Sequence, residues 1–165
     1  KMGINIFKAT EKDIIYKLKE IGIEFDENIG YWRLVDVLWK AVRKDLAGPG
    51  FLVGQPVQLN PLPKRRDDDP RKGAQMQIIL AGSEMGNGYT ELNNPLDLEE
   101  RFKEQREMSE AGDTEAHEHD ETFIEALRYG MPPAFGFGVS ERLFSVMMDR
   151  PIRECVFFPL MKPRS

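Results

Sequence analysis

The sequence contains a single cysteine and no long apolar run. Cys155 is the only cysteine among 165 residues, which excludes an internal disulfide and favours a reducing compartment. No apolar stretch approaches the roughly 20 residues that a membrane-spanning helix needs. The first residues, KMGINIFKATEKD, lack the pattern of a secretory signal. We therefore expect a soluble protein of the cytoplasm with no membrane partner.

A strong charge of one sign is also missing. The chain has 23 lysines and arginines against 28 aspartates and glutamates, which gives a formal net charge of −5. Such a chain does not attract nucleic acid as a whole, so a nucleic-acid partner would require a local basic patch or another domain. Hydrophobic residues make up 41% and charged residues 31%. These fractions and the length are typical of one soluble globular domain.

Residues 10–47 are predicted to form a helical segment. Thr10 can cap the first helix, Asp13 stands at the reciprocal position of a capping box, and Gly22 ends the helix. A second helix is predicted from about Tyr31 to Leu46, before the Gly-Pro-Gly at 48–50. The apolar stripes of the two helices are Ile14, Ile15, Leu18 and Ile21, then Leu34, Val35, Leu38, Trp39 and Val42.

Residues 51–165 are predicted to form an antiparallel sheet flanked by helices, which makes the fold α+β. The central hairpin pairs 76–80 with 84–92 through a turn at 81–83. Further short strands are predicted at 51–53, 57–59 and 155–158, and an exposed loop at 61–73. Helices are predicted at 97–111, from Asp120 to before Gly130 with Phe123, Ala126 and Leu127 as apolar positions, and from a cap at Ser140 to Met148.

The stretch 84–95, EMGNGYTELNNP, carries the clearest candidate site. Alternate side chains of a strand point the same way, so Asn87, Tyr89 and Glu91 offer an amide, an aromatic ring and a carboxylate in a row. Gly86 and Gly88 between them allow another backbone or a ligand to come close. A carboxylate beyond an aromatic wall suits a ligand with an aliphatic stem and a cationic tip, such as lysine. The alternative is the solvated face of an amphipathic strand.

A second candidate site is GFGVSERL at 136–143. A glycine-rich strand that leads into a capped helix places Arg142 in the first helical turn. Helix N-terminal amides and a guanidinium can jointly hold a phosphate. The alternative is a tight strand-to-helix connection with an arginine on the surface.

Two other charged clusters favour solvated surfaces over sites. Asp113, His117, His119 and Asp120 match no zinc spacing and lie in an acidic stretch, which indicates a solvated helix start. Lys64, Arg65 and Arg66 are followed at once by three aspartates at 67–69, which cancel the basic patch.

Taken in order, several segments resemble class II lysyl-tRNA synthetases. They are VGQPVQLNPLPKR, GSEMGNGYTELNNPLDLEERFKEQ, DETFIEALRYGMPP and GFGVSERL, the last of which corresponds to motif 3 of that family. IRECVFFPLMKP resembles the family's closing segment. The resemblance covers about Thr10 to Pro163 and implies that residues 1–165 are the C-terminal part of a class II catalytic domain.

The resemblance implies a reaction and roles for residues. The family joins lysine to ATP as an adenylate, releases pyrophosphate and passes lysine to tRNA(Lys), and the complete enzyme is expected to be a homodimer. Asn87, Tyr89 and Glu91 would line the lysine pocket, with Glu91 pairing the ε-ammonium. Glu84 would hold Mg²⁺ on ATP, and Arg142, after Gly138, would grip the ATP phosphates.

The chain also departs from the family pattern. Motifs 1 and 2 and the anticodon-binding barrel are missing from these residues, so we expect a portion of a lysine–tRNA ligase that is inactive alone. The alternatives are a non-catalytic amino-acid-binding or regulatory module descended from a synthetase, or a truncated reading frame without activity.

Three departures concern the candidate sites. Gln77 stands where the family usually has a second magnesium-binding glutamate. Glu141 replaces the usual aspartate before Arg142, and the glycine spacing there is one residue shorter than usual. Glu84 has the opposite strand parity to Asn87, so a bulge at Gly86 or Gly88 is needed to bring both side chains to one site.

Overall fold

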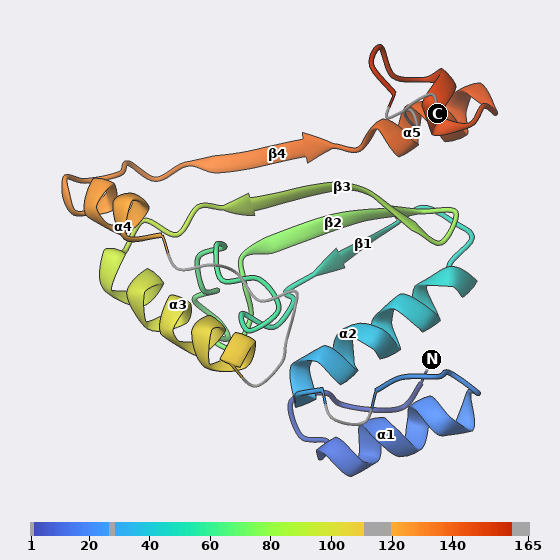
Figure 1. Cartoon of the computed structure of the whole chain (residues 1–165), viewed down its shortest axis with the longest axis horizontal. Coiled ribbons are helices and arrows are strands. Elements are labelled where there is room, and N and C mark those ends of the chain that lie inside the picture. Colours follow the sequence, from blue (N-terminus) through green and yellow to red (C-terminus); the bar gives the residue numbers. More distant parts are fainter. Residues whose placement is uncertain (1, 27–28, 111–119, 160–165) are drawn as a thin grey trace, which may run out of the picture.

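The computed structural model describes residues 2–26, 29–110 and 120–159. In chain order its elements are α1 (Glu11–Glu20), α2 (Tyr31–Val42), the 3₁₀ turn η1 (Arg43–Asp45), β1 (Gly50–Val53), β2 (Gln75–Leu80), β3 (Ser83–Thr90), α3 (Pro95–Glu110), α4 (Glu121–Arg128), β4 (Phe135–Val139), α5 (Glu141–Met148) and the 3₁₀ turn η2 (Ile152–Glu154) (Figure 1). An antiparallel sheet with surrounding helices confirms the predicted α+β class.

The first two helices form where they were predicted, except that α2 ends at Val42 and the predicted stretch to Leu46 continues as the 3₁₀ turn η1. At the start of α1 the Thr10 hydroxyl accepts a hydrogen bond from the Asp13 amide, and the Asp13 carboxylate accepts one from the Thr10 amide, so the capping box is complete. The apolar stripes of α1 and α2 then pack together in one core, whose buried members are Ile14, Leu18, Leu34, Val35 and Leu38.

The sheet has four antiparallel strands in the order β1-β2-β3-β4. The predicted hairpin is β2–β3, and its two-residue turn is Ala81–Gly82. Both turn residues have positive φ, 49° and 67°, which is the backbone twist that suits a tight hairpin. The strand predicted at 57–59 is wrong, because this stretch forms a turn after Pro56 in which Val57 is buried.

A bulge interrupts β3 at Met85. Ile78 pairs with Gly86, whereas the next residue, Ile79, pairs with Glu84, so Met85 is an extra residue without an opposite partner. One extra residue reverses strand parity and brings Glu84 to the face that carries Asn87. The predicted bulge is therefore confirmed, one residue before Gly86.

The stretch 61–73, predicted as an exposed loop, is partly buried. Pro61 and Pro63 are fully buried, because Arg101 of α3 reaches under this segment. Arg101 is itself only 1% exposed, and its Nη1 donates to the carbonyls of Pro61, at 3.0 Å, and Pro63, at 2.6 Å. Pro63 in turn forms an isolated bridge with Glu91. The segment thus runs beside the end of β3 and pairs with it without forming a regular strand.

The charged tip of the same stretch behaves as the sequence indicates. Arg66 and Asp68 form an exposed ion pair of 2.7 Å, so this arginine is engaged within the loop. Arg65 instead forms an ion pair of 3.1 Å with Asp97 of α3. Lys64 is exposed. Three neighbouring cations therefore do not gather into one basic patch.

A second apolar core lies between α3 and α4. Its buried members are Leu92, Leu98, Phe102, Ile124 and Leu127. The helix predicted to start near Asp120 does so, and Asp120 caps α4 by accepting a hydrogen bond from the Phe123 amide. The expected apolar side of α4 is wrong in part: Phe123 and Ala126 are exposed, because the side that meets α3 is the one with Ile124.

The chain ends with β4, α5 and η2. Ser140 caps α5 by accepting a hydrogen bond from the Arg142 amide, as predicted. The closing strand predicted at 155–158 is wrong, since these residues form bends, and Phe157 and Phe158 are almost fully exposed. An apolar run without a neighbouring strand has no partner for its backbone groups, so residue type alone does not make it a strand.

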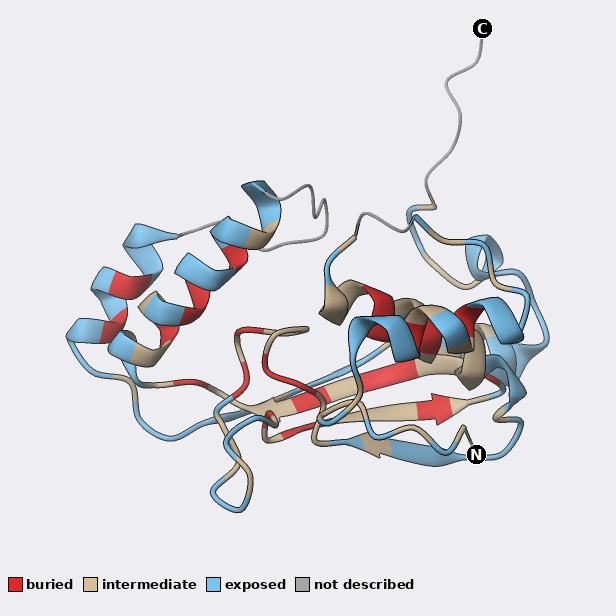
Figure 2. Ribbon diagram, turned by 90° about the horizontal axis from the view of Figure 1, so that it is seen from below, coloured by how far each residue is buried: buried red, intermediate tan, exposed pale blue. Residues whose placement is uncertain are grey.

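The α1–α2 pair and the α3–α4 pair stand on the same side of the sheet, with the irregular segment between them (Figure 2). On the opposite side, strand alternation places apolar residues that are exposed at both edges of the sheet: Phe51, Val53, Phe135, Phe137 and Val139. None of the helices in the described ranges has the length and apolar character needed to cross a membrane.

Candidate functional site

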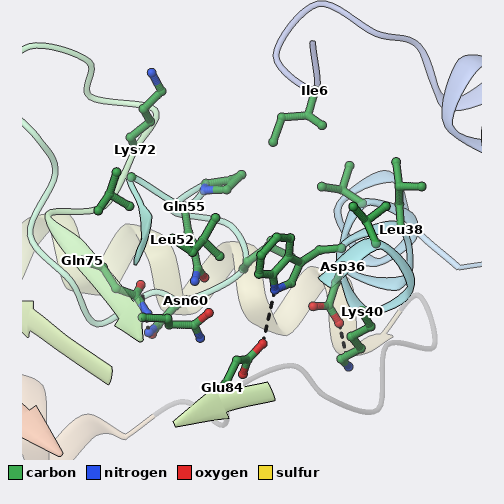
Figure 3. Close-up of a pocket in the computed structure, with 18 of the residues that line it drawn as sticks. Ile6, Asp36, Leu38, Lys40, Leu52, Gln55, Asn60, Lys72, Gln75 and Glu84 are labelled. Carbon is green, nitrogen blue, oxygen red and sulfur yellow. Dashed lines mark hydrogen bonds and ion pairs between the residues drawn. The ribbon is translucent and has the colours of Figure 1, made fainter. Parts of the chain in front are cut away.

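A cavity of about 790 Å³ lies between α2 and the sheet. The sheet contributes a polar row from its two central strands, and Figure 3 shows how several of the lining side chains converge. The polar residues of this row are Gln75, Gln77, Glu84, Asn87 and Tyr89. The opposite wall is mainly apolar and comes from α2 and the N-terminal segment, with Ile4, Ile6, Val35 and Leu38. Such a cavity suits a ligand that has both an aliphatic and a polar part.

A chain of amides fixes the orientation of Asn87. Its Oδ1 accepts a hydrogen bond of 2.9 Å from Nε2 of Gln75, and Gln75 Oε1 accepts one of 3.4 Å from Nδ2 of Asn60. Gln75 is 7% exposed and lies directly opposite Tyr89 in the sheet. Because the Asn87 carbonyl is engaged, its NH₂ group is the part that faces the cavity as a donor.

Tyr89 and Glu91 extend the row toward the end of β3. Burial raises the pKa of the Tyr89 phenol, and the negative charge of Glu91 raises it further. Glu91 lies beyond the lining of the cavity, half-buried, with its carboxylate against Gly136 of β4. The three side chains share one face of the sheet, as predicted. Asn87 and Tyr89 pair with Gly138 and Gly136, and the Glu91 carboxylate lies on the same face, where a β-carbon on Gly136 would meet it.

The glycines around this row have different neighbours. Gly136 and Gly138 leave backbone alone on the cavity side of β4, and a β-carbon on Gly138 would meet nothing within 4 Å. Gly88 faces the other side, where a β-carbon would lie 2.7 Å from Phe137 and 2.9 Å from Phe135. The close approach expected at Gly88 is therefore made by phenylalanines of the neighbouring strand.

Glu84 has two partners that its sequence context did not reveal. Trp39 of α2 donates from Nε1 to Glu84 Oε1 at 3.2 Å, a bond drawn in Figure 3, and Arg43 Nε lies 3.6 Å from the same oxygen. Both partners are about 40 residues away in the chain, and Trp39 was predicted only as part of an apolar stripe. Trp39 and Arg43 are four residues apart, about one helical turn, and this spacing is the one sequence signal that places both on one side of the continuous α2–η1 segment.

The described residues do not fit a fixed magnesium site. Magnesium requires several oxygen ligands at close to octahedral geometry and favours carboxylates. Glu84 is the only acidic residue among the described sheet residues that line the cavity, Gln77 is neutral, and the Glu84 carboxylate already faces a guanidinium. Within 2–26, 29–110 and 120–159, no three His, Cys, Asp or Glu side chains come together as a metal cluster. Asp113, His117 and His119 lie outside these ranges.

Arg142 and Gly138 lie at the β4–α5 junction, outside the cavity lining. The junction is held beside the bulge of β3, because the Ser140 amide donates to the Met85 carbonyl at 2.9 Å. Arg142 is exposed in the first turn of α5, where the amides of a helix start add a partial positive charge. The junction thus presents a cation next to the strand that carries the polar row.

Comparison with known proteins agrees with the sequence motifs. The family model described as tRNA synthetases class II (D, K and N) matches residues 8–162. A protein named lysine–tRNA ligase from Thermotoga sp. (strain RQ2) is 40% identical over 99% of this chain and 33% of its own length. Proteins of the same name from Roseiflexus sp. (strain RS-1) and Staphylococcus saprophyticus are 41% and 38% identical, each over 98% of this chain and 34% of their own length. The chain spans about a third of the length of the curated relatives it matches.

Proposed function

Since the chain belongs to the class II tRNA synthetases (D, K and N), we propose that it supplies the lysine pocket and part of the ATP site of a lysine–tRNA ligase. The relatives' name supports lysine as the amino acid. The observation that carries the proposal is the row of Asn87, Tyr89 and Glu91, which lies on one open strand face opposite two glycines.

Lysine would lie along β3 with its two ends at the two polar ends of the row. The NH₂ group of Asn87 is a donor, so it suits the carboxylate of the amino acid, while the Glu91 carboxylate suits the ε-ammonium. Tyr89 lies between them and offers a ring to the aliphatic stem. This arrangement distinguishes lysine from leucine by charge and from arginine by the shape of the cationic group.

ATP would approach from the β4–α5 junction. Arg142 would bind its phosphates, and the backbone at Gly138, opposite Asn87, leaves room beside the amino acid. In the proposed first step an oxygen of the lysine carboxylate bonds to the α-phosphorus while the bond to pyrophosphate breaks. No side-chain nucleophile takes part, so these residues act by positioning the reactants and neutralising phosphate charge.

The remaining steps belong to the complete protein in this proposal. Transfer of lysine to tRNA(Lys), a homodimeric state and a cytoplasmic location follow from the family resemblance. Because the chain spans about a third of its relatives, we propose that it does not complete the reaction alone. Lysine-dependent pyrophosphate exchange distinguishes this from the alternative of a non-catalytic amino-acid-binding module. A complete gene product that binds lysine without exchange would be such a module.

Calorimetric titration with amino acids tests the proposed pocket. Lysine should bind more tightly than arginine, ornithine or leucine. Glu91→Gln should weaken lysine binding by about 2–4 kcal/mol, because it removes the charged partner of a desolvated ammonium. Glu104→Gln, in the exposed part of α3, removes the same charge elsewhere and should leave the affinity unchanged. Equal lysine affinities for the wild type and Glu91→Gln would contradict the assignment.

A further inference from the structure

Arg43 already occupies the position of a cation at Glu84. Its Nε lies 3.6 Å from Glu84 Oε1, which is an ion-pair distance, and the two side chains are 19% and 33% exposed. Trp39 donates to the same oxygen at 3.2 Å. The Glu84 carboxylate is therefore held from one side by a positive charge and a neutral donor, both from the α2–η1 segment.

Tight packing holds Arg43 in this position. Its Nη1 donates to the Gly82 carbonyl at 2.9 Å, and the Gly82 amide donates to the Leu46 carbonyl at 2.9 Å. A β-carbon on Gly82 would lie 2.9 Å from the Cα and the carbonyl oxygen of Lys44, so the hairpin turn and η1 are in backbone contact. Because η1 and the β2–β3 turn hold each other in place, the Arg43 guanidinium has little freedom to move away from Glu84.

Two buried polar atoms have no hydrogen-bond partner among the described residues: Arg43 Nε, which lies 3.6 Å from Glu84 Oε1, and Oε1 of Gln77, which lines the same cavity as Glu84. The unpaired Nε is a donor that lies just outside hydrogen-bond distance of Glu84 Oε1, at 3.6 Å. A glutamate at position 77 would give the row a second acidic side chain, whereas the amide of Gln77 adds no charge. At Glu84 itself, one carboxylate faces one guanidinium.

We infer that Arg43 is the resident cation of the Glu84 site and excludes a divalent metal ion from it. A dication at Glu84 would have to displace or closely approach a guanidinium held by its own contacts, and like charges repel at such short distances. Glu84 then acts as a positioning residue, which ties β3 to α2 through Trp39 and Arg43. The inference goes beyond the proposed function, because ion binding by this chain does not require lysine activation.

Manganese binding by the purified 165-residue chain tests the inference. Mn²⁺ takes the same oxygen ligands as Mg²⁺, and electron paramagnetic resonance measures its free concentration directly. Arg43→Gln should bind Mn²⁺ at least about tenfold more tightly than the wild type, because a repelling charge is gone and a carboxylate is released. Adding Glu84→Gln to that variant should abolish the gain. Lys44→Gln, which removes an exposed positive charge from the neighbouring residue, should match the wild type.

A second variant, with Arg43 left in place, tests the same inference and can be used even if Arg43→Gln does not fold. Glu84→Gln alone should leave Mn²⁺ binding unchanged, because Arg43 already keeps the ion away. The same variant should change the fluorescence of Trp39, whose indole loses a charged acceptor. Weaker Mn²⁺ binding by Glu84→Gln would overturn the inference, as would equal Mn²⁺ affinities of folded Arg43→Gln and Lys44→Gln.

Discussion

The carboxylate of Glu91 packs against Gly136 of β4 so closely that a β-carbon on residue 136 would lie 2.6 Å from Glu91 Oε1. The obstacle is the far end of a flexible side chain, so Gly136→Ala should be accommodated when the carboxylate turns away. We expect the fold to persist and lysine affinity to fall by about 1–3 kcal/mol, as when a charged hydrogen-bond partner is lost. Calorimetry without ATP measures the change.

Gly138→Ala is the matched control for that variant. Gly138 lies two residues along the same strand and on the same face, but its β-carbon would enter open space. Lysine affinity in the absence of nucleotide should therefore stay at the wild-type value. Equal losses in the two alanine variants would mean that the strand, and not the Glu91 carboxylate, responds to the substitution.

The ionisation of Tyr89 should report the position of Glu91 in the unliganded chain. Burial raises the pKa of Tyr89 first, and the Glu91 charge raises it further, because both disfavour a phenolate. Glu91→Gln removes the second cause and should lower the pKa of Tyr89 toward its ordinary value. Tyrosinate absorbance against pH measures it, with Tyr89→Phe subtracted to remove the other tyrosines. An unchanged pKa would show that the two side chains do not face each other.

Local sequence signals predicted most of the fold. The caps at Thr10, Asp120 and Ser140 are hydrogen bonds between residues two or three apart, so residue type and spacing contain all the information they need. The hairpin and the shared face of Asn87 and Tyr89 follow from strand alternation. Even the bulge at Met85 was predictable, because Glu84 and Asn87, two candidate site residues of opposite strand parity, required one extra residue to share a face.

Contacts between distant parts of the chain were not predictable in this way. Arg101 buries Pro61 and Pro63 from a helix some 40 residues later, which turned an expected loop into an edge beside Glu91. Trp39 fits an apolar stripe equally well whether its indole nitrogen is free or bound to Glu84. Phe157 and Phe158 have strand propensity but no neighbouring strand. Such outcomes depend on which surfaces meet, and spacing along the chain does not record that.

Arg101 should be a major source of stability for the end of β3 next to Glu91. Its guanidinium is buried, pairs with Asp97 through two nitrogens at 2.9 and 2.8 Å and holds two proline carbonyls. Arg101→Met should lower the free energy of unfolding by about 3–5 kcal/mol, because a buried charge and two carbonyls lose their partner. Urea unfolding measures the loss. Arg106→Met, exposed on the same helix, should change stability by less than about 0.5 kcal/mol.

The same network predicts how stability depends on acid. Burial alone would raise the pKa of Asp97, but hydrogen bonds from Arg101 and Arg65 outweigh it, and the pKa lies below its usual value. The unfolded chain has an aspartate pKa of about 3.9. Above that pH both states are ionised and the full stabilisation is present. As the pH falls from there through the lower pKa of the folded state, the unfolded state binds the proton first, so the stabilisation is lost.

Unfolding free energies of the wild type and Asp97→Asn, measured by urea at successive pH values, should therefore converge in acid. At neutral pH the variant should be less stable, because an amide cannot be a charged partner for two arginines. Below about pH 4 the wild-type curve should fall more steeply than that of the variant, and the gap between them should narrow. Asp67→Asn, which removes an exposed carboxylate nearby, should follow the wild-type curve. A constant gap between wild type and Asp97→Asn at every pH would mean that Asp97 stabilises the fold by shape alone, without its charge.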